Sequence, residues 1–172
     1  SVFRLHTMPT PYLLLVNGKI IVYIIVCLIQ FLMTIAVGKY LLPQMGLPAL
    51  VLGNSMMGIL ILTLATAFAA TGFGVMTGTL ATTEHQAAIM GSLSILLLSA
   101  LGGIWVPSYV MPEVMRNISA CSPLNWSLEG YSKLFLRGGG VADIFWDAIK
   151  LMVFFFATMS ISYFANRKKR TV

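Results

Sequence analysis

Adjacent Glu84 and His85 are the residues of this chain that most suggest chemistry, because carboxylates and imidazoles act as metal ligands and as general acids or bases. They stand in a short polar segment, Thr79 to Gln86, between two apolar runs. Adjacent residues on a helix do not face one another, and no second histidine or cysteine follows at the spacing of a metal ligand. The sequence therefore favours a loop that a soluble partner contacts over a metal or catalytic site. A merely solvated loop is the alternative.

Motifs for hydrolysing a nucleotide or cutting a bond are missing from the sequence. There is no glycine-rich loop ending in Lys-Ser/Thr, no HExxH and no serine–histidine pair at membrane depth. No apolar run carries a charged residue near its middle, where ion-coupled carriers place theirs. We expect no catalytic residue, bound cofactor or metal in this chain. If it moves a solute actively, the energy must come from a partner.

The composition is that of an all-α integral membrane protein. Hydrophobic residues make up 58% of the chain and charged residues only 9%, with a mean hydropathy of +0.90. Much of the formal net charge of +6 lies in Arg167-Lys-Lys-Arg170, directly after an apolar run. By the positive-inside rule this predicts a multi-pass protein of the cell (inner) membrane with a cytoplasmic C-terminus, rather than binding to nucleic acid. Neither a disulfide nor a metal site is predicted from Cys27 and Cys121.

Four apolar runs are long enough to cross a bilayer, and we expect a transmembrane domain over residues 18–172. The expected spans are residues 20–41, 54–77, 87–106 and 145–165. We expect residues 1–17 to form an interfacial elbow, with a disordered leader as the alternative. We expect residues 166–172 to form a basic cytoplasmic tail. Trp146 fits a membrane interface, where Asp147 and Lys150 would still reach water. The chain opens without an initiator methionine or a signal pattern, so we expect it to be part of something longer.

Residues 107–140, between the last two spans, predict an external hairpin of two short amphipathic helices. Apolar residues recur at helical spacing from Val110 to Ile118 and again from Leu124 to Phe135, and Glu129 and Lys133 form an i,i+4 pair. Cys121-Ser-Pro123 separates the two helices, and Gly138-Gly-Gly140 ends the second. Such a hairpin would cap whatever the flanking spans enclose. The alternative is that both helices pack on the bundle for stability alone.

Inside the spans, the informative residues are one amide and a set of small residues. Gln30 is the strongly polar residue of the first span, and would either hydrogen-bond a neighbouring helix or line a path. Gly74 and Gly78 form a GxxxG pattern in the second span. It predicts close helix packing, within the chain or across a dimer.

Short motifs follow one another in an order that resembles a known family. They are Arg4 with Met8-Pro9 and Gly18-Lys19; Gly74 with Gly78-Thr-Leu-Ala-Thr-Thr-Glu-His-Gln-Ala87; Leu101-Gly-Gly-Ile-Trp-Val-Pro107 with Met111-Pro112; and Ile118-Ser119, Ser122-Pro123, Leu128-Glu-Gly-Tyr131 and Leu136-Arg137-Gly138. As an ordered set they resemble the C-terminal portion of a type-2 ABC exporter permease, the membrane subunit that works with a separate ATP-binding-cassette ATPase.

The resemblance implies a role for each end of the bundle. Residues 1–17 would be a coupling helix and elbow, and Thr79 to Gln86 a second cytoplasmic contact with the ATPase, which would bind ATP and Mg²⁺. The coupling residues would be Arg4, Pro9, Lys19, Thr83, Glu84, His85 and Gln86. The hairpin would close the external exit as a gate, with Pro107, Met111, Pro112, Pro123, Glu129, Tyr131, Arg137 and Gly138. Two permease subunits, identical or different, would form the path at their interface within the lipid, and two further spans would precede Ser1.

Two other classes of function remain open from the residues alone. An ATPase-independent channel or secondary carrier would place Gln30 in its path. A membrane scaffold would use the small-residue faces for assembly and would need no ATPase.

Overall fold

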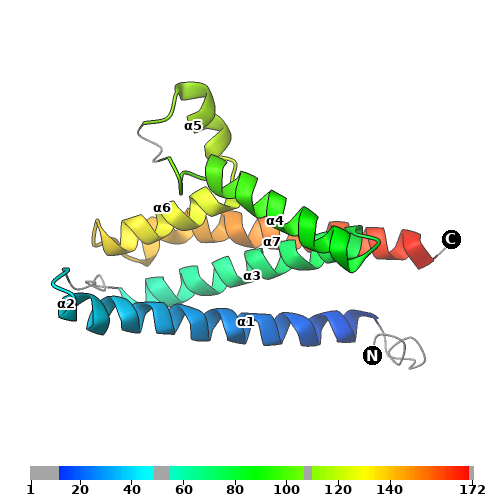
Figure 1. Ribbon diagram of the computed structural model, residues 1–172, viewed down its shortest axis with the longest axis horizontal. Helices are drawn as coiled ribbons and strands as arrows, with labels where there is room; N and C mark the ends of the chain where they lie inside the picture. Colours follow the sequence, from blue (N-terminus) through cyan, green and yellow to red (C-terminus); the bar gives the residue numbers. More distant parts are fainter. Residues whose placement is uncertain (1–11, 49–54, 107–109, 171–172) are drawn as a thin grey trace.

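The computed structural model describes residues 12–48, 55–106 and 110–170 as a bundle of helices (Figure 1). In chain order the elements are α1 (Tyr12–Ala36), the π-helical turn η2 (Val37–Leu41), α2 (Leu42–Gln44), α3 (Met56–Leu80), α4 (Glu84–Leu101), α5 (Glu113–Ser119), α6 (Pro123–Phe135) and α7 (Val141–Arg170). Four helical stretches are long and apolar enough to cross a membrane, namely Gly18–Gln44, Met56–Leu80, Glu84–Leu101 and Val141–Arg167. The predicted all-α membrane fold is confirmed.

The helices at the two ends of the predicted transmembrane domain extend beyond the predicted first and last spans. Helix α1 already begins at Tyr12, so residues 12–17 of the predicted elbow are helical and continue into the first span. A single Gly18 costs a helix only about 1 kcal/mol relative to alanine, too little to interrupt a continuous apolar run. Helix α7 likewise continues to Arg170, so the predicted tail is helical as far as that residue. Basic side chains suit a helix C-terminus because they complement its dipole. The rest of the elbow, with Arg4 and Pro9, lies outside the described residues.

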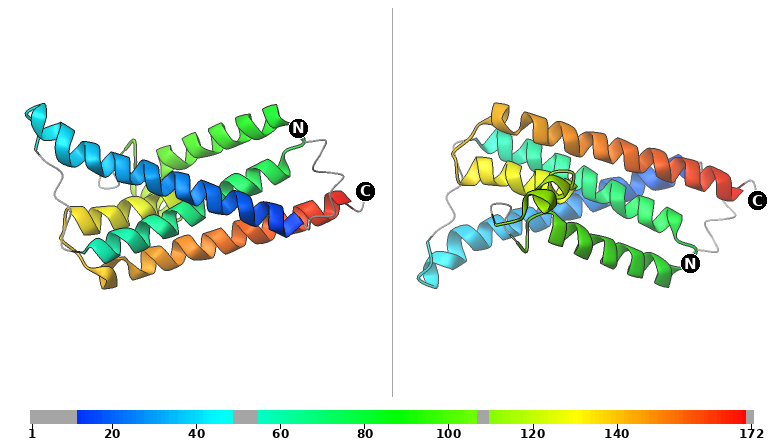
Figure 2. Two further views of the ribbon diagram at one scale, coloured as in Figure 1. Left: turned by 90° about the horizontal axis from the view of Figure 1, so that it is seen from below. Right: turned by 90° about the horizontal axis from the view of Figure 1, so that it is seen from above.

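The core of the bundle lies between α3 and α7, which run side by side in the same direction (Figures 1 and 2). Its buried residues come from α3, α6 and α7, and are Ile59, Leu62, Ala65, Ala69, Leu134, Ile144, Ala148 and Leu151. Helix α1 contacts α3, and its Phe31 and Ile35 pack against the buried core. Helix α4 has no buried residue. Most of α1 and α4 is therefore available to lipid or to another protein.

Close packing of α3 on α7 depends on Gly72 rather than on the predicted Gly74 and Gly78. A Cβ added to Gly72 would lie 2.6 Å from Thr158 Oγ1 and 2.7 Å from Phe155 Cδ2, so only glycine lets α7 approach this near. At Gly74 and Gly78 an added Cβ meets nothing within 4 Å. Both glycines are exposed. Their packing across a dimer stays a prediction.

We expect Gly72→Ala to lower the free energy of unfolding by about 1–3 kcal/mol, because the added methyl overpacks the α3–α7 contact. Gly74→Ala is the matched control, two residues away on the same helix. It should leave stability unchanged or raise it by up to about 1 kcal/mol through helix propensity. Thermal unfolding in detergent, followed by circular dichroism, measures both. Equal losses in the two variants would contradict the assignment and would mean that Gly74 packs against protein outside the chain.

Candidate functional site

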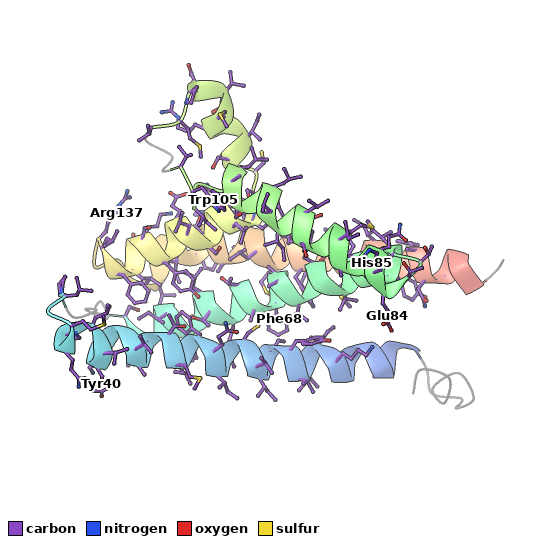
Figure 3. All side chains as sticks on the ribbon, in the orientation of Figure 1. Tyr40, Phe68, Glu84, His85, Trp105 and Arg137 are labelled. Atoms are coloured by element: carbon purple, nitrogen blue, oxygen red, sulfur yellow. The ribbon has the colours of Figure 1, made fainter. Side chains whose placement is uncertain are left out.

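The bundle brings the described parts of the predicted coupling segments to one end of the molecule. Glu84 and His85 lie at the end where α7 terminates and α1 begins (Figure 3). We call this the basic end, defined by the start of α1 with Lys19, the α3–α4 turn (residues 81–83) with the first turn of α4, and the last turns of α7. Tyr40 and Arg137 lie at the opposite end (Figure 3).

The start of α4 is shaped by a reciprocal set of hydrogen bonds. Thr83 Oγ1 accepts from the Gln86 backbone N–H at 3.1 Å and so caps the helix. Gln86 Oε1 accepts in return from the Thr82 N–H at 2.9 Å and from the Thr82 hydroxyl at 2.6 Å. This arrangement is close to a capping box. Thr83 and Gln86 therefore hold the turn in shape, while exposed Glu84 and His85 are the groups it offers to a partner.

The same turn is joined to α7. Thr79, in the last turn of α3, and Ser162 of α7 share a hydrogen bond of 2.7 Å between their hydroxyl oxygens. Ala81 in the turn is buried. A force on the turn therefore acts on α7 as well as on α3. Sequence reasoning missed Ser162, since a serine within an apolar span gives no sign of its partner.

No metal site is formed by the described residues. No group of three or more histidine, cysteine, aspartate or glutamate side chains gathers within them. Glu84 and His85 are exposed at the start of α4, and their contact with a partner stays a prediction.

The predicted hairpin is present as two helices, and its second helix enters the bundle. Pro112 is the N-cap of α5 and Pro123 opens α6, where a missing N–H costs no hydrogen bond. Helix α6 packs on α7 and α3, α4 packs mainly on α3, and α5 projects sideways from the junction of α4 and α6 (Figures 1 and 2). At 13 residues α6 is about 20 Å long, too short to cross a hydrocarbon core of about 30 Å. It is a half-length helix packed on the spans, not a cap lying across their ends.

Aromatic and hydroxyl groups fasten α6 to α3 and α1. The Tyr131 hydroxyl donates to Thr63 Oγ1 at 3.0 Å, and the Tyr131 ring stacks on Phe31 with centroids 5.6 Å apart. Gly130 packs against Leu62, where an added Cβ would lie 2.8 Å from Leu62 Cδ2. Leu134 is 1% exposed within the core. Tyr131, predicted as a gate residue, thus serves to attach α6.

A cluster of four charges joins α6 to α7. Lys133 Nζ lies 2.7 Å from Asp147 Oδ2 and 3.5 Å from Glu129 Oε1, and Lys150 Nζ lies 3.7 Å from Asp147 Oδ1. Burial opposes the charge on Lys133, but the hydrogen bond to Asp147 and the charges of Asp147 and Glu129 outweigh it and raise the pKa of the ammonium above its ordinary value. Lys133 therefore stays charged at neutral pH.

The position of Asp147 corrects the expectation that it reaches water at an interface. The residue is 1% exposed, and Lys133 of α6 is its nearest ionic partner. The predicted i,i+4 pair of Glu129 and Lys133 exists, but it is the longer of the two contacts that Lys133 makes. Helical spacing identifies residues that share a face and does not identify the helix that covers that face.

The remaining gate residues differ in their exposure. Met111 is buried, whereas Pro112, Glu129 and Arg137 are exposed. Gly138 has φ +63° in the α6–α7 turn, a conformation that favours glycine. Pro107 lies outside the described residues.

Gln30 does not bond a neighbouring helix within the described part of the chain. The residue is exposed on α1, and its backbone carbonyl accepts from the Thr34 hydroxyl at 2.9 Å. Its amide is therefore directed to the surroundings of the bundle.

We expect Tyr131→Phe to lower the free energy of unfolding by about 1 kcal/mol, because it removes the hydrogen bond to Thr63. Thr63 keeps its bond to the Ile59 carbonyl, so no buried hydroxyl is left unpaired. Tyr163→Phe is the control. That tyrosine is 46% exposed and its hydroxyl has no partner within the described residues, so the change should stay within about 0.5 kcal/mol. Equal effects in denaturant unfolding would contradict an anchoring role for Tyr131.

Comparison with known proteins gives one match. No curated protein and no solved structure matches the chain. The model of the family described as ABC-2 type transporter matches residues 1–136. This range includes the α3–α4 turn and both helices of the hairpin. The chain is a multi-pass transport permease that belongs to the ABC-2 type transporter family.

Proposed function

We propose that this chain is the permease subunit of an ABC exporter, driven by a separate cytoplasmic ATPase that binds at the basic end. The observation that carries the proposal is the family match over a region that includes exposed Glu84 and His85, at the end where the basic C-terminal segment lies. The positive-inside rule assigns this end, and with it the C-terminus, to the cytoplasm of a cell-membrane protein. ATP and Mg²⁺ would bind the partner ATPase and not this chain.

We expect the contacts of the α3–α4 turn to transmit movement of the ATPase to the transmembrane helices. ATPase movement against Glu84 and His85 would act on α3 through the chain and on α7 through the bond between Thr79 and Ser162. Because α3 and α7 pack closely at Gly72, they would tilt together. Helix α6, which rests on both, would follow at the opposite end.

A second permease subunit would complete the path. Helix α4 and most of α1 are unburied in the single chain. Lipid can cover apolar side chains, but the exposed amide of Gln30 is better satisfied by a protein partner or a wet path. We propose that the path lies between two such subunits, identical or different, with Gln30, Gly74 and Gly78 on surfaces that are free for it, and with the α5–α6 hairpin at its outer exit.

One observation favours a secondary carrier instead. Asp147 is a buried carboxylate in a helix that can span the membrane, the kind of group that carriers use for ion coupling. However, Asp147 stands in the second turn of α7 rather than near its middle, and Lys133 already neutralises it at 2.7 Å. We therefore rank the carrier second.

The test is recovery of a stoichiometric ATP-hydrolysing subunit with the chain purified from its native membranes. We expect Glu84→Lys to reduce this recovery about tenfold, the effect of losing roughly 1.4 kcal/mol from a charged contact. Glu113→Lys is the matched control, since Glu113 is also exposed and opens α5 as Glu84 opens α4.

Glu113→Lys should leave recovery of the ATPase unchanged. Loss in both variants would point to damage at helix N-termini rather than to a contact at the basic end. A clean permease without any ATPase, under conditions that preserve a known cassette complex, would contradict the proposal and favour the carrier or the scaffold.

A further inference from the structure

Among the charges around α6, one pair joins two helices. Glu129 and Lys133 belong to the same helix, as do Asp147 and Lys150, so neither of these contacts can hold α6 against another element. The bond of 2.7 Å between Lys133 and Asp147 crosses from α6 to α7. Asp147 is the buried member of the cluster, whereas the side chains of Glu129 and Lys150 are 49% and 48% exposed.

We propose that Lys133 and Asp147 are positioning residues that hold α6 in a fixed place on α7. This rests on the proposed function. It keeps α6 from moving relative to α7, so that opening at the outer end moves α6 only together with α3 and α7.

The physical reason is the environment of Asp147. If α6 left the bundle, Asp147 would keep only Lys150, at 3.7 Å on its own helix, and its carboxylate would face the space that α6 had filled. A charge left without its partner in a membrane-spanning helix is strongly unfavourable. The pair thus resists separation of α6 from α7, because separation leaves a buried charge without its partner.

Contacts with α3 also hold α6 in its place. Tyr131 bonds Thr63, and Gly130 fits against Leu62, both at the α3 surface. Helix α6 is therefore attached to two spans by polar bonds of different kinds. Helix α5 is attached to α6 and α4 rather than to α3 or α7: of its residues only Ser119 is buried, the carbonyl of its C-cap Ala120 accepts from Trp126 Nε1 of α6 at 2.6 Å, and the helix packs on α4.

The position of α6 can be followed through a cysteine on its buried face. Ser127 is 7% exposed, and its hydroxyl bonds only carbonyls of α6 itself, so Ser127→Cys should be tolerated. Cys27 and Cys121 are first replaced by serine, which leaves this thiol as the reporter. The rate of its reaction with a small maleimide, in the full chain reconstituted in liposomes, measures how often α6 leaves its site.

We expect Lys133→Met to speed labelling at position 127 by about tenfold or more, because the broken pair leaves a buried charge. Lys150→Met is the matched control: the same substitution beside the same carboxylate, but on the helix that carries Asp147. It should change the rate less than about twofold, since an exposed pair contributes little. Lys133→Arg should restore slow labelling. So should the double variant Lys133→Met, Asp147→Leu, which leaves no charge unpaired.

A second reporter separates a displaced α6 from an unfolded bundle. Thr158→Cys lies on α7 where it meets Gly72 of α3, and its labelling should not change in any of these variants. Joint acceleration at positions 127 and 158, or equal effects of Lys133→Met and Lys150→Met, would overturn the proposal. Should Lys133→Met fail to accumulate, Asp147→Asn takes its place. The assay needs no ATPase, so an absent ATPase would refute the exporter and leave this result standing.

Discussion

The close approach of α3 and α7 at Gly72 is the contact on which the rest of the structure depends. With no side chain at that position, Thr158 and Phe155 of α7 rest directly on the α3 backbone. The two helices then offer one joint surface. Helix α6 packs on it near one end, and the α3–α4 turn is tied to it at the other through Thr79 and Ser162. Both regions predicted to carry function are thus mounted on the same pair of helices, which is what a mechanical link between the two ends of a transporter requires.

Polar groups within this apolar bundle divide into two kinds. Most threonines, such as Thr66 and Thr71, donate to carbonyls of their own helix and need no neighbour. A few side chains bond across helices instead, and these lie where a short element must be held: Tyr131 and Lys133 hold α6, and Thr79 holds the α3–α4 turn. In a membrane the hydrophobic effect distinguishes poorly between helix neighbours, so such bonds and close small-residue contacts decide which surfaces meet.

Much of the fold could be predicted from hydropathy because the membrane imposes it. Four apolar runs of sufficient length, and a two-helix hairpin broken at Pro123, follow from composition and spacing alone. The sequence could not predict which helix packs against which face of another helix. Three glycines occur within seven residues of α3, yet only Gly72 meets α7, and nothing in the pattern separates it from Gly74 and Gly78. Asp147 was expected to reach water, because the sequence does not reveal that tertiary packing brings α6 over this residue.

The junction between α4 and α6 links this packing to transport. Helix α4 spans 18 residues, about 27 Å, which nearly equals a hydrocarbon core of about 30 Å. If the bundle axis lies along the membrane normal, the turn after α4 therefore lies near the membrane interface at the end opposite to Glu84. Gly102 and Gly103 are buried in this turn, whereas the large apolar side chains of Ile104, Trp105 and Val106 are exposed in the single chain. An apolar surface next to the α5–α6 hairpin can be covered by lipid or by a second subunit, and a second subunit there would place its contact beside the proposed exit of the path.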